Sequence, residues 1–154
     1  RKESSAASDV YKRQDNGKHA LSFFEIITNF IQENKDHSEL NVAFLDKLKV
    51  GSKDLQAASM YFMQNGIKNP YDALAGSYDF MHMMGHVCLG LMWSKMAKIS
   101  MLKLEKNCSN SEFYKTKIKT GKFYMERWMP MTSLHLNRIQ SGSETIMSMT
   151  AENF

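Results

Sequence analysis

Two histidines, His82 and His86, are the side chains whose type and spacing could do chemistry. On a helix, residues four apart share a face, so both imidazoles could bind one metal ion or a haem iron. Met83, Met84 or Cys88 could lie close to such a site. No third ligand is evident, no glutamate follows His82, and no Glu-x-x-His pair is present. A metal or haem site therefore stays an alternative to two histidines at a helix–helix contact or at the rim of the bundle.

Other reactive arrangements are weaker. Cys88 and His86 could form a nucleophile and base, but residues two apart on one helix point in different directions. There is no glycine-rich phosphate loop, Gly-x-Ser-x-Gly, Cys-x-x-Cys or dinucleotide fingerprint. We therefore assign no catalytic, cofactor-binding or metal-ligating residue from the sequence.

The histidines lie in a long segment from Asn69 to Glu105, whose sequence predicts one continuous helix. Asn69 can cap it, and Pro70 suits the first helical position. At 1.5 Å per residue the helix would be roughly 50 Å long. Between Phe80 and Trp93 the only strongly polar side chains are the two histidines, which predicts a central helix buried among its neighbours. The apolar run is too short for a membrane span.

Three further helices are predicted to position this one. The first runs from about Gly17 to Glu33 after a cap at Asp15 or Asn16, and its apolar positions are Leu21, Phe24, Ile27 and Ile31, widened by Phe23 and Phe30. The second runs from Ser38 to Gln64 after a capping box of Asp36 and Glu39. Its apolar phase continues through Gly51, which favours one helix over a break at Gly51-Ser52.

The last long helix is predicted from Glu112 to Gln140, capped by Ser111 and closed by Gly142. Its apolar stripe is Tyr114, Ile118, Gly121, Met125, Trp128, Thr132, Leu136 and Ile139. Pro130 falls on the polar side, which predicts a bend rather than a break. A short terminal turn would then be anchored on the bundle by Ile146, Met149 and Phe154. Short loops between long helices predict an all-α fold, an antiparallel four-helix bundle with long helices.

Composition bounds the function. The 154 residues suffice for one domain, and two prolines with eight glycines disfavour a turn-rich β fold. A net charge of +4 without a dense basic block predicts no nucleic-acid partner.

Lysines at 95, 98, 103, 115, 117, 119 and 122 could form a basic interaction or membrane surface, although a solvated face is the simpler interpretation. Two cysteines, and no signal peptide or transmembrane segment, indicate a reducing, cytoplasmic compartment.

Residues 1–14 differ from the rest of the chain. They show no apolar periodicity, which predicts a disordered tail, and the run SSAASDVYKRQ resembles translated sequencing-adapter read-through. Excluding them removes four positive and two negative charges and lowers the net charge from +4 to +2. The credible domain is then 15–154, and the natural protein is expected to extend upstream.

Several short motifs along residues 15–154 resemble the C-terminal domain of large acyl-CoA dehydrogenases, most closely the 3-methylmercaptopropionyl-CoA dehydrogenase type. They are Asn69-Pro70 opening a helix, Gly85, the run GLMWSKMA at 90–97, Phe113-Tyr114 with Lys117, Phe123-Tyr124-x-Glu126-Arg127 before Pro130, and Ile139-x-x-Gly142 before a terminal Phe154. His82 and His86 depart from the aliphatic or aromatic positions of that pattern.

The resemblance implies an accessory domain. Full-length members bind FAD, oxidise an acyl-CoA to the enoyl-CoA with a catalytic glutamate, and pass electrons to an electron-transfer flavoprotein. The glutamate and most flavin contacts belong to upstream domains, so no catalytic residue maps onto this chain. The fragment alone is expected to bind no FAD and to be inactive. Its role would be packing on the flavin-binding domains of the same chain and subunit contact in a homo-oligomer. The alternative is a free-standing four-helix bundle that binds haem or metal through His82 and His86.

Overall fold

The computed structural model describes residues 18–66, 68–106 and 109–153, and their regular structure is helical throughout. The elements are α2 (Lys18–Asn34), α3 (Ser38–Leu40), the π-helical turn η1 (Asn41–Leu45), α4 (Asp46–Asn65), α5 (Pro70–Glu105), α6 (Ser111–Arg127), α7 (Met131–Gln140), α8 (Glu144–Met147) and the 3-10 turn η2 (Ala151–Asn153). This confirms the all-α fold class. The predicted tail at 1–14 and caps at Asp15 or Asn16 lie outside the described residues.

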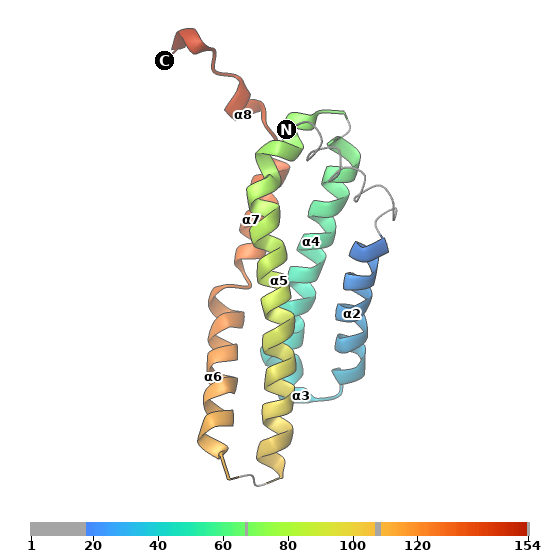
Figure 1. Cartoon of the computed structure of the whole chain (residues 1–154), viewed down its shortest axis with the longest axis vertical. Helices are drawn as coiled ribbons and strands as arrows, with labels where there is room; N and C mark the ends of the chain where they lie inside the picture. The colour runs from blue at the N-terminus through green and yellow to red at the C-terminus, as the bar shows by residue number, and fades with distance from the viewer. Residues whose placement is uncertain (1–17, 67, 107–108, 154) are drawn as a thin grey trace, which may run out of the picture.

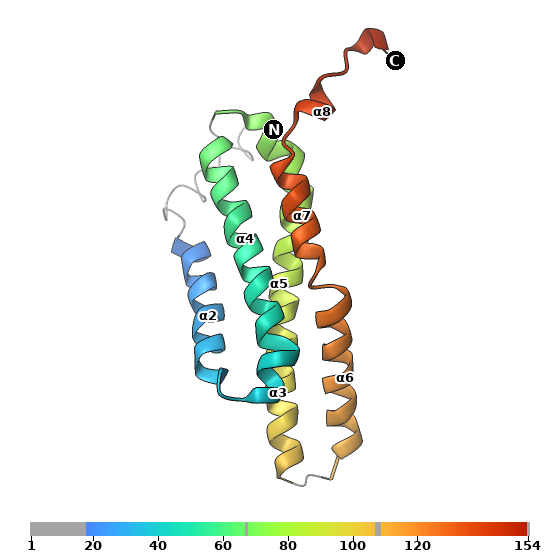
Figure 2. The same ribbon diagram turned by 180° about the vertical axis from the view of Figure 1, so that it is seen from behind.

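The long helices run alternately down and up along one axis (Figure 1). The chain descends through α2, rises through α4, descends through α5 and rises again through α6 and α7. Helix α5 packs against α4, α6 and α7, and from behind α4 and α7 lie in front of it (Figure 2). Within the described residues, five helices of ten or more residues therefore build the bundle, with α6 and α7 together in the place predicted for one.

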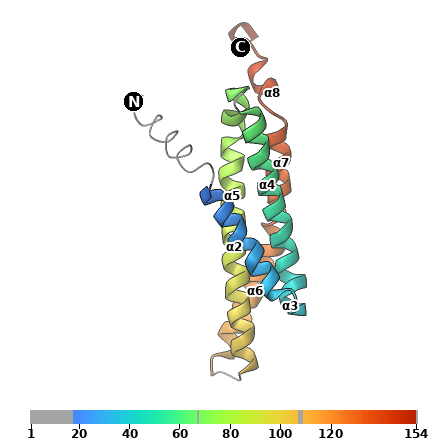
Figure 3. The same ribbon diagram turned by 90° about the vertical axis from the view of Figure 1, so that its right-hand side faces the viewer.

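Helix α2 has the predicted position, but fewer of its residues contact the bundle than the sequence predicts. It packs on α4 and lies inclined to the axis of α5 (Figure 3). Ile27 is fully buried and Phe30 nearly so, whereas Leu21 is 61% exposed. The prediction that Leu21 faces the core is wrong because the inclined α2 leaves the bundle surface toward its first turn.

The second helical segment is continuous from Ser38 to Asn65, as predicted, with no break at Gly51. It differs in two details. Its cap is His37, whose Nδ1 accepts from the backbone N–H of Leu40 at 3.4 Å, so the capping box of Asp36 with Glu39 is wrong. Its second turn is a π-helix, a local change in hydrogen bonding that apolar periodicity does not reveal.

The long helix α5 begins and ends where the sequence predicts. Asn69 has an extended backbone and its side chain accepts from the N–H of Tyr71, while Pro70 occupies the first helical position. The helix continues for 36 residues without interruption. Its bounds follow from local signals, because a cap and a proline both act within one turn.

The predicted helix from Glu112 to Gln140 is interrupted, so its description as one bent helix is wrong. Helix α6 ends at Arg127, a three-residue turn follows, and α7 begins at Met131. Asn110 rather than Ser111 precedes α6. The turn buries Met129 to 2% exposure and leaves Trp128 48% exposed, the reverse of the predicted stripe.

Met129 takes this place because two glycines make room for it. A Cβ built on Gly51 of α4 would lie 2.5 Å from the Met129 methyl carbon, and one on Gly90 of α5 would lie 2.6 Å from its sulfur. The side chain therefore fills the space between α4 and α5 where both lack side chains. The helix break lets the Met129 side chain point into the bundle. Filling this space stabilises the fold, because protein interiors are close-packed.

The C-terminal segment also departs from prediction. Gly142 has a φ of 69°, the left-handed conformation that ends a helix, as predicted for the end of α7. Beyond it, α8 and η2 project past the end of the bundle (Figures 1 and 2). Ile146 is 63% exposed and Met149 is 59% exposed, so neither anchors the segment, and Phe154 lies outside the described residues.

Candidate functional site

His82 and His86 meet a third histidine that the sequence analysis did not include. His135 of α7 lies between them, with ring centroids 6.0 Å from His82 and 5.6 Å from His86. The rings are within 17° and 23° of parallel, and Trp128 stacks on His86 at 6.0 Å. The four rings form a stacked column along the contact of α5 with α7 and the turn before it.

A carboxylate orients the central ring of this column. Asp79 Oδ1 lies 2.8 Å from His135 Nδ1 and 3.3 Å from a guanidinium nitrogen of Arg138. The side chains of Asp79 and His135 are each only 7% exposed. A buried carboxylate is costly without partners, so this pair fixes the register of α7 against α5. The spacing of Asp79, His82 and His86 on one helix face is the sequence signal that could have indicated it.

His86 is held from the side of α6. The Tyr124 hydroxyl donates to the His86 carbonyl oxygen at 3.2 Å and lies 3.3 Å from its Nδ1. Burial lowers the pKa of His86, and the neighbouring His135 and His82 lower it further. Burial, with a smaller contribution from Cys88, raises the pKa of Tyr124 to about 12. At neutral pH both groups are uncharged, as a packed interior favours.

The stacked rings make a packed contact between α5 and α7. Among the residues that the structure describes, no three or more histidine, cysteine, aspartate or glutamate side chains are placed to hold a metal ion. Parallel rings stack through their faces, whereas ligands must direct ring nitrogens at one point. Burial also raises the pKa of Cys88, which keeps the thiol protonated, the opposite of what a nucleophile needs.

An open hollow of about 590 Å³ lies where α7 ends beside the start of α5. Asp72 lies in its wall, and its Oδ1 accepts from the N–H and the hydroxyl of Ser143 at 2.9 and 2.7 Å and from Asn69 at 3.0 Å. These bonds tie the chain after Gly142 to the first turn of α5. The Asp72 carboxylate at this hollow therefore stabilises the fold by holding these two segments together.

Several lysines of the predicted basic surface have partners within the chain. Lys115 pairs with Glu112 at 2.9 Å, and Lys122 pairs with Glu39 at 3.0 Å. The ammonium of Lys98 lies 5.9 Å from the centroid of the Phe30 ring. These contacts favour the simpler interpretation, a solvated face.

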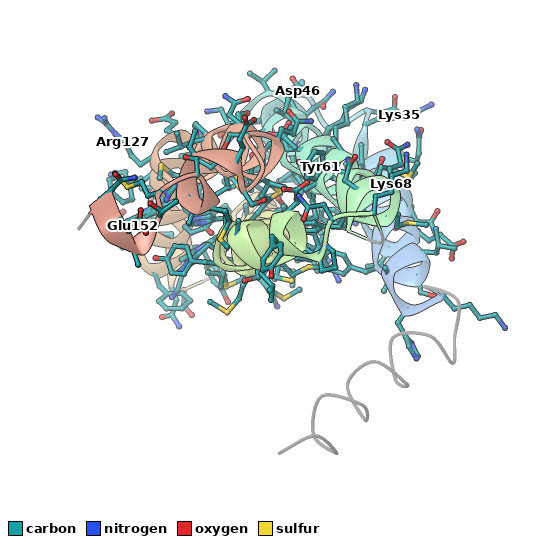
Figure 4. The ribbon with its side chains drawn as sticks, turned by 90° about the horizontal axis from the view of Figure 1, so that it is seen from above. Lys35, Asp46, Tyr61, Lys68, Arg127 and Glu152 are labelled. Atoms are coloured by element: carbon teal, nitrogen blue, oxygen red, sulfur yellow. The ribbon has the colours of Figure 1, made fainter. Side chains whose placement is uncertain are left out.

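The most unusual surface is the side of α5 that faces away from the bundle. Figure 4 shows α5 at the edge of the molecule, with side chains, several of them ending in sulfur, that point outward. We define the outer stripe as Tyr71, Leu74, Tyr78, Met81, Gly85, Leu89, Met92, Met96 and Ile99, all exposed.

The outer stripe carries no charge. From Tyr71 to Leu102, the only other exposed residues of α5 are Ser77 and Leu102 itself. Leu74 is 69% exposed and Met81 is 62% exposed. Within the described residues, the predicted burial of α5 among neighbours is met on the sides that face α4, α6 and α7, and the outer stripe has no neighbour there. In the described part of the chain, no helix has the length and hydropathy to cross a membrane.

Gly85 occupies the centre of the outer stripe. A Cβ built there would meet nothing within 4 Å. Gly51, Gly76, Gly90 and Gly121 differ, because a Cβ at each would approach a neighbouring side chain within 3.0 Å. Packing against the described residues therefore does not require a glycine at position 85.

Comparison with models of protein families matches residues 23–150 to the family described as "Acetyl-CoA dehydrogenase C-terminal like". The match covers all of α4 to α8 and most of α2. No curated protein matches the chain.

Proposed function

The chain belongs to the acetyl-CoA dehydrogenase C-terminal-like family, and on that premise we propose that it is the accessory helical domain of an FAD-dependent acyl-CoA dehydrogenase. In this proposal the flavin site and the catalytic glutamate lie upstream, and the domain packs on the flavin-binding domains and contributes to subunit contact. Full-length enzymes would oxidise an acyl-CoA to the enoyl-CoA and reduce an electron-transfer flavoprotein.

The observation that carries the packing role is the uncharged outer face of α5. Monomeric proteins rarely expose a continuous apolar patch of this length, and such patches mark interaction sites. Helix α2 begins beside α5, on the side away from α4 and α7 (Figure 3).

The finer assignments belong to the same proposal. They are the 3-methylmercaptopropionyl-CoA dehydrogenase type, a cytoplasmic homo-oligomer, a domain spanning 15–154, and an origin of residues 1–14 in adapter read-through. The motifs that resemble that type support the first of these. The lack of apolar periodicity in 1–14 supports the last.

The DNA upstream of the codon for Asp15 tests the proposal directly. We expect the reading frame to continue into a flavin-binding dehydrogenase with a glutamate at the end of its helical region. A start codon immediately upstream of Asp15 would overturn the accessory-domain assignment.

A biochemical test uses the chain as it stands. The purified chain, mixed with FAD and acyl-CoA thioesters of several lengths, should retain no flavin and reduce no electron-accepting dye. The flavin-binding domains encoded upstream, added in trans, should bind it and gain thermal stability. Acyl-CoA oxidation by the chain alone, or a failure of the two parts to associate, would contradict the proposal.

A further inference from the structure

Three of the four rings stacked between α5 and α7 belong to histidines. We refer to His82, His135, His86 and Trp128 as the ring column. The ring centroid of His135 lies 6.0 Å from that of His82 and 5.6 Å from that of His86. Imidazole is the side chain that ordinarily changes its charge between pH 5 and pH 8. The ring column therefore joins three groups that a modest fall in pH can charge together.

The carboxylate that contacts the ring column is that of Asp79 on α5. Its Oδ1 lies 2.8 Å from Nδ1 of His135 and 3.3 Å from a guanidinium nitrogen of Arg138 on α7. A protonated His135 could pair with this carboxylate, although Arg138 already shares it. One carboxylate therefore offsets at most one added positive charge in the ring column.

The other ionisable neighbours on α5 and α6 bring no negative charge to the histidines. His82 packs on Tyr78 of its own helix, with ring centroids 4.3 Å apart. The Tyr124 hydroxyl of α6 lies 3.3 Å from Nδ1 of His86, and burial with a contribution from Cys88 raises the pKa of Tyr124 to about 12. Burial also raises the pKa of Cys88. A proton added to His82 or His86 therefore gains no anionic partner from these groups.

A second proton in the ring column costs free energy for two reasons. It charges a ring that is partly or fully buried, and it places like charges on rings 5.6 to 6.0 Å apart. His86 shows both effects, because burial lowers its pKa and the neighbouring His135 and His82 lower it further. Separation of α7 from α5 reduces both costs, since it exposes the rings to water and moves His135 away from the other two.

Helix α7 has further attachments that contain no histidine. The hydroxyls of Thr132 and Ser133, in its first turn, donate to Asp54 of α4 at 2.8 Å each. Beyond its other end, the hydroxyl of Ser143 donates to Asp72 of α5 at 2.7 Å. Loss of the ring column would therefore loosen the side of α7 that faces α5, while both ends of α7 stay tied to the bundle.

We propose that the ring column is a pH-sensitive contact that holds α7 on α5 at neutral pH and loosens α7 from α5 when its histidines are protonated in mildly acidic solution. The inference goes beyond the proposed function, since it rests on contacts within one chain. The change should be confined to α7 and the part of α5 that faces it. Helix α2 lies on the far side of the bundle from α7 and should not respond (Figures 1 and 2).

Hydrogen exchange of the whole chain at pH 7.5 and pH 5.5 tests the proposal. Mass spectrometry of peptides from α7 and α2 gives protection factors, which are corrected for the intrinsic pH dependence of exchange and report local opening. A histidine that takes up its proton only after opening favours the open form by roughly tenfold at pH 5.5. We expect the protection of α7 to fall at least about tenfold between the two pH values, and that of α2 to change less than about twofold.

Variants of the two histidines without an anionic partner test the ring column itself. His82→Phe combined with His86→Phe keeps aromatic rings on both sides of His135, so the protection of α7 should then change less than about twofold. His19→Phe, at an exposed position of α2, is the matched control and should keep the wild-type response. Circular dichroism at pH 7.5 checks the fold. If the double variant does not fold, each single variant should show a response several-fold smaller than the wild type.

Three results would overturn the proposal. The first is a protection of α7 that is the same at both pH values. The second is an equal loss of protection in α2 and α7, which would mean that the whole chain opens. The third is a wild-type response in the variants of the ring column, or a lost response in the control. These measurements involve no FAD, acyl-CoA or upstream domain, so their failure would leave the proposed accessory role untouched.

Discussion

Asp79 is the buried charge on which the contact of α5 with α7 depends. It accepts from His135 and pairs with Arg138. Asp79 holds His135 in place, and His82 and His86 both stack on the ring of His135. The column is held by ring stacking and one carboxylate, and each buried side-chain polar atom among the described residues has a partner.

We expect Asp79→Ala to lower the free energy of unfolding by about 2–3 kcal/mol, because it leaves the buried His135 without its acceptor. Urea unfolding followed by circular dichroism measures the change. Glu126→Ala, at an exposed position of α6, is the matched control and should stay within about 0.5 kcal/mol. Equal effects of the two substitutions would show that the buried pair contributes nothing.

His86 should make stability depend on pH. Its pKa is lowered in the folded state from the usual 6.5, so the unfolded chain binds the proton more tightly. Stability is therefore greatest above the unfolded pKa and falls as the pH drops through 6.5 toward the lower folded pKa. We expect His86→Phe, which retains an aromatic ring beside Trp128 and His135, to flatten this part of the curve.

The measurement is the urea midpoint of both proteins from pH 8 to pH 5. Carboxylates contribute equally to the two curves, so their difference reports His86 together with its coupling to His82 and His135. Identical slopes for the wild type and the variant would contradict the lowered pKa.

At the scale of the elements, glycines decide how closely the helices approach. Gly121 of α6 faces Phe44 of η1, where an added Cβ would lie 2.8 Å from a ring carbon. Phe44 is fully buried and cannot swing aside. The helix break at Trp128–Pro130 belongs to the same scale, because Met129 enters the space above Gly51 and Gly90.

The same substitution at two helical glycines should have opposite effects. We expect Gly121→Ala to destabilise the chain by about 1–2 kcal/mol, since overpacking against Phe44 exceeds the gain in helix propensity. Gly85→Ala should stabilise each folded chain by about 0.5–1 kcal/mol, because its methyl group meets nothing. Urea unfolding at concentrations where any dimer has dissociated compares them. A stabilising Gly121→Ala would mean that α6 can shift away from η1.

At the scale of the whole molecule, the bundle ends at Ser143. Ser143 is bound to Asp72, whereas α8 and η2 beyond it extend away and contribute no buried residue. The apolar outer face of α5 is likewise a property of the whole chain, since it exists only because α4, α6 and α7 all pack on the other sides.

A chain ending after Ser143 should therefore keep its stability within about 0.5 kcal/mol, because the removed residues are exposed. A second chain ending after Arg138 should lose several kcal/mol, since it removes the fully buried Ile139 and the bonds to Asp72. Thermal unfolding compares both with the full chain. A large loss in the first chain would show that residues after Ser143 support the bundle.

Local signals were sufficient for most of the fold. The sequence by itself determined the helix over Pro70–Glu105, the continuous helix through Gly51, and the end of α7 at Gly142, because caps, prolines and 3.6-residue periodicity act within a few turns. The motifs around Gly85 and 90–97 also indicated the family to which the chain belongs. Leu21, Asp36 and Pro130 were misjudged where packing or a competing cap outweighed the local pattern.

Only the tertiary structure decided which face of each helix has a partner. The meeting of His135 with His82 and His86 joins residues about fifty apart in the chain, and no periodicity encodes such a distance. Met129 and not Trp128 turns inward because Gly51 and Gly90 from two other helices leave the space. The outer stripe is exposed for the same reason, because the described helices that pack most on α5, namely α4, α6 and α7, lie on its other sides.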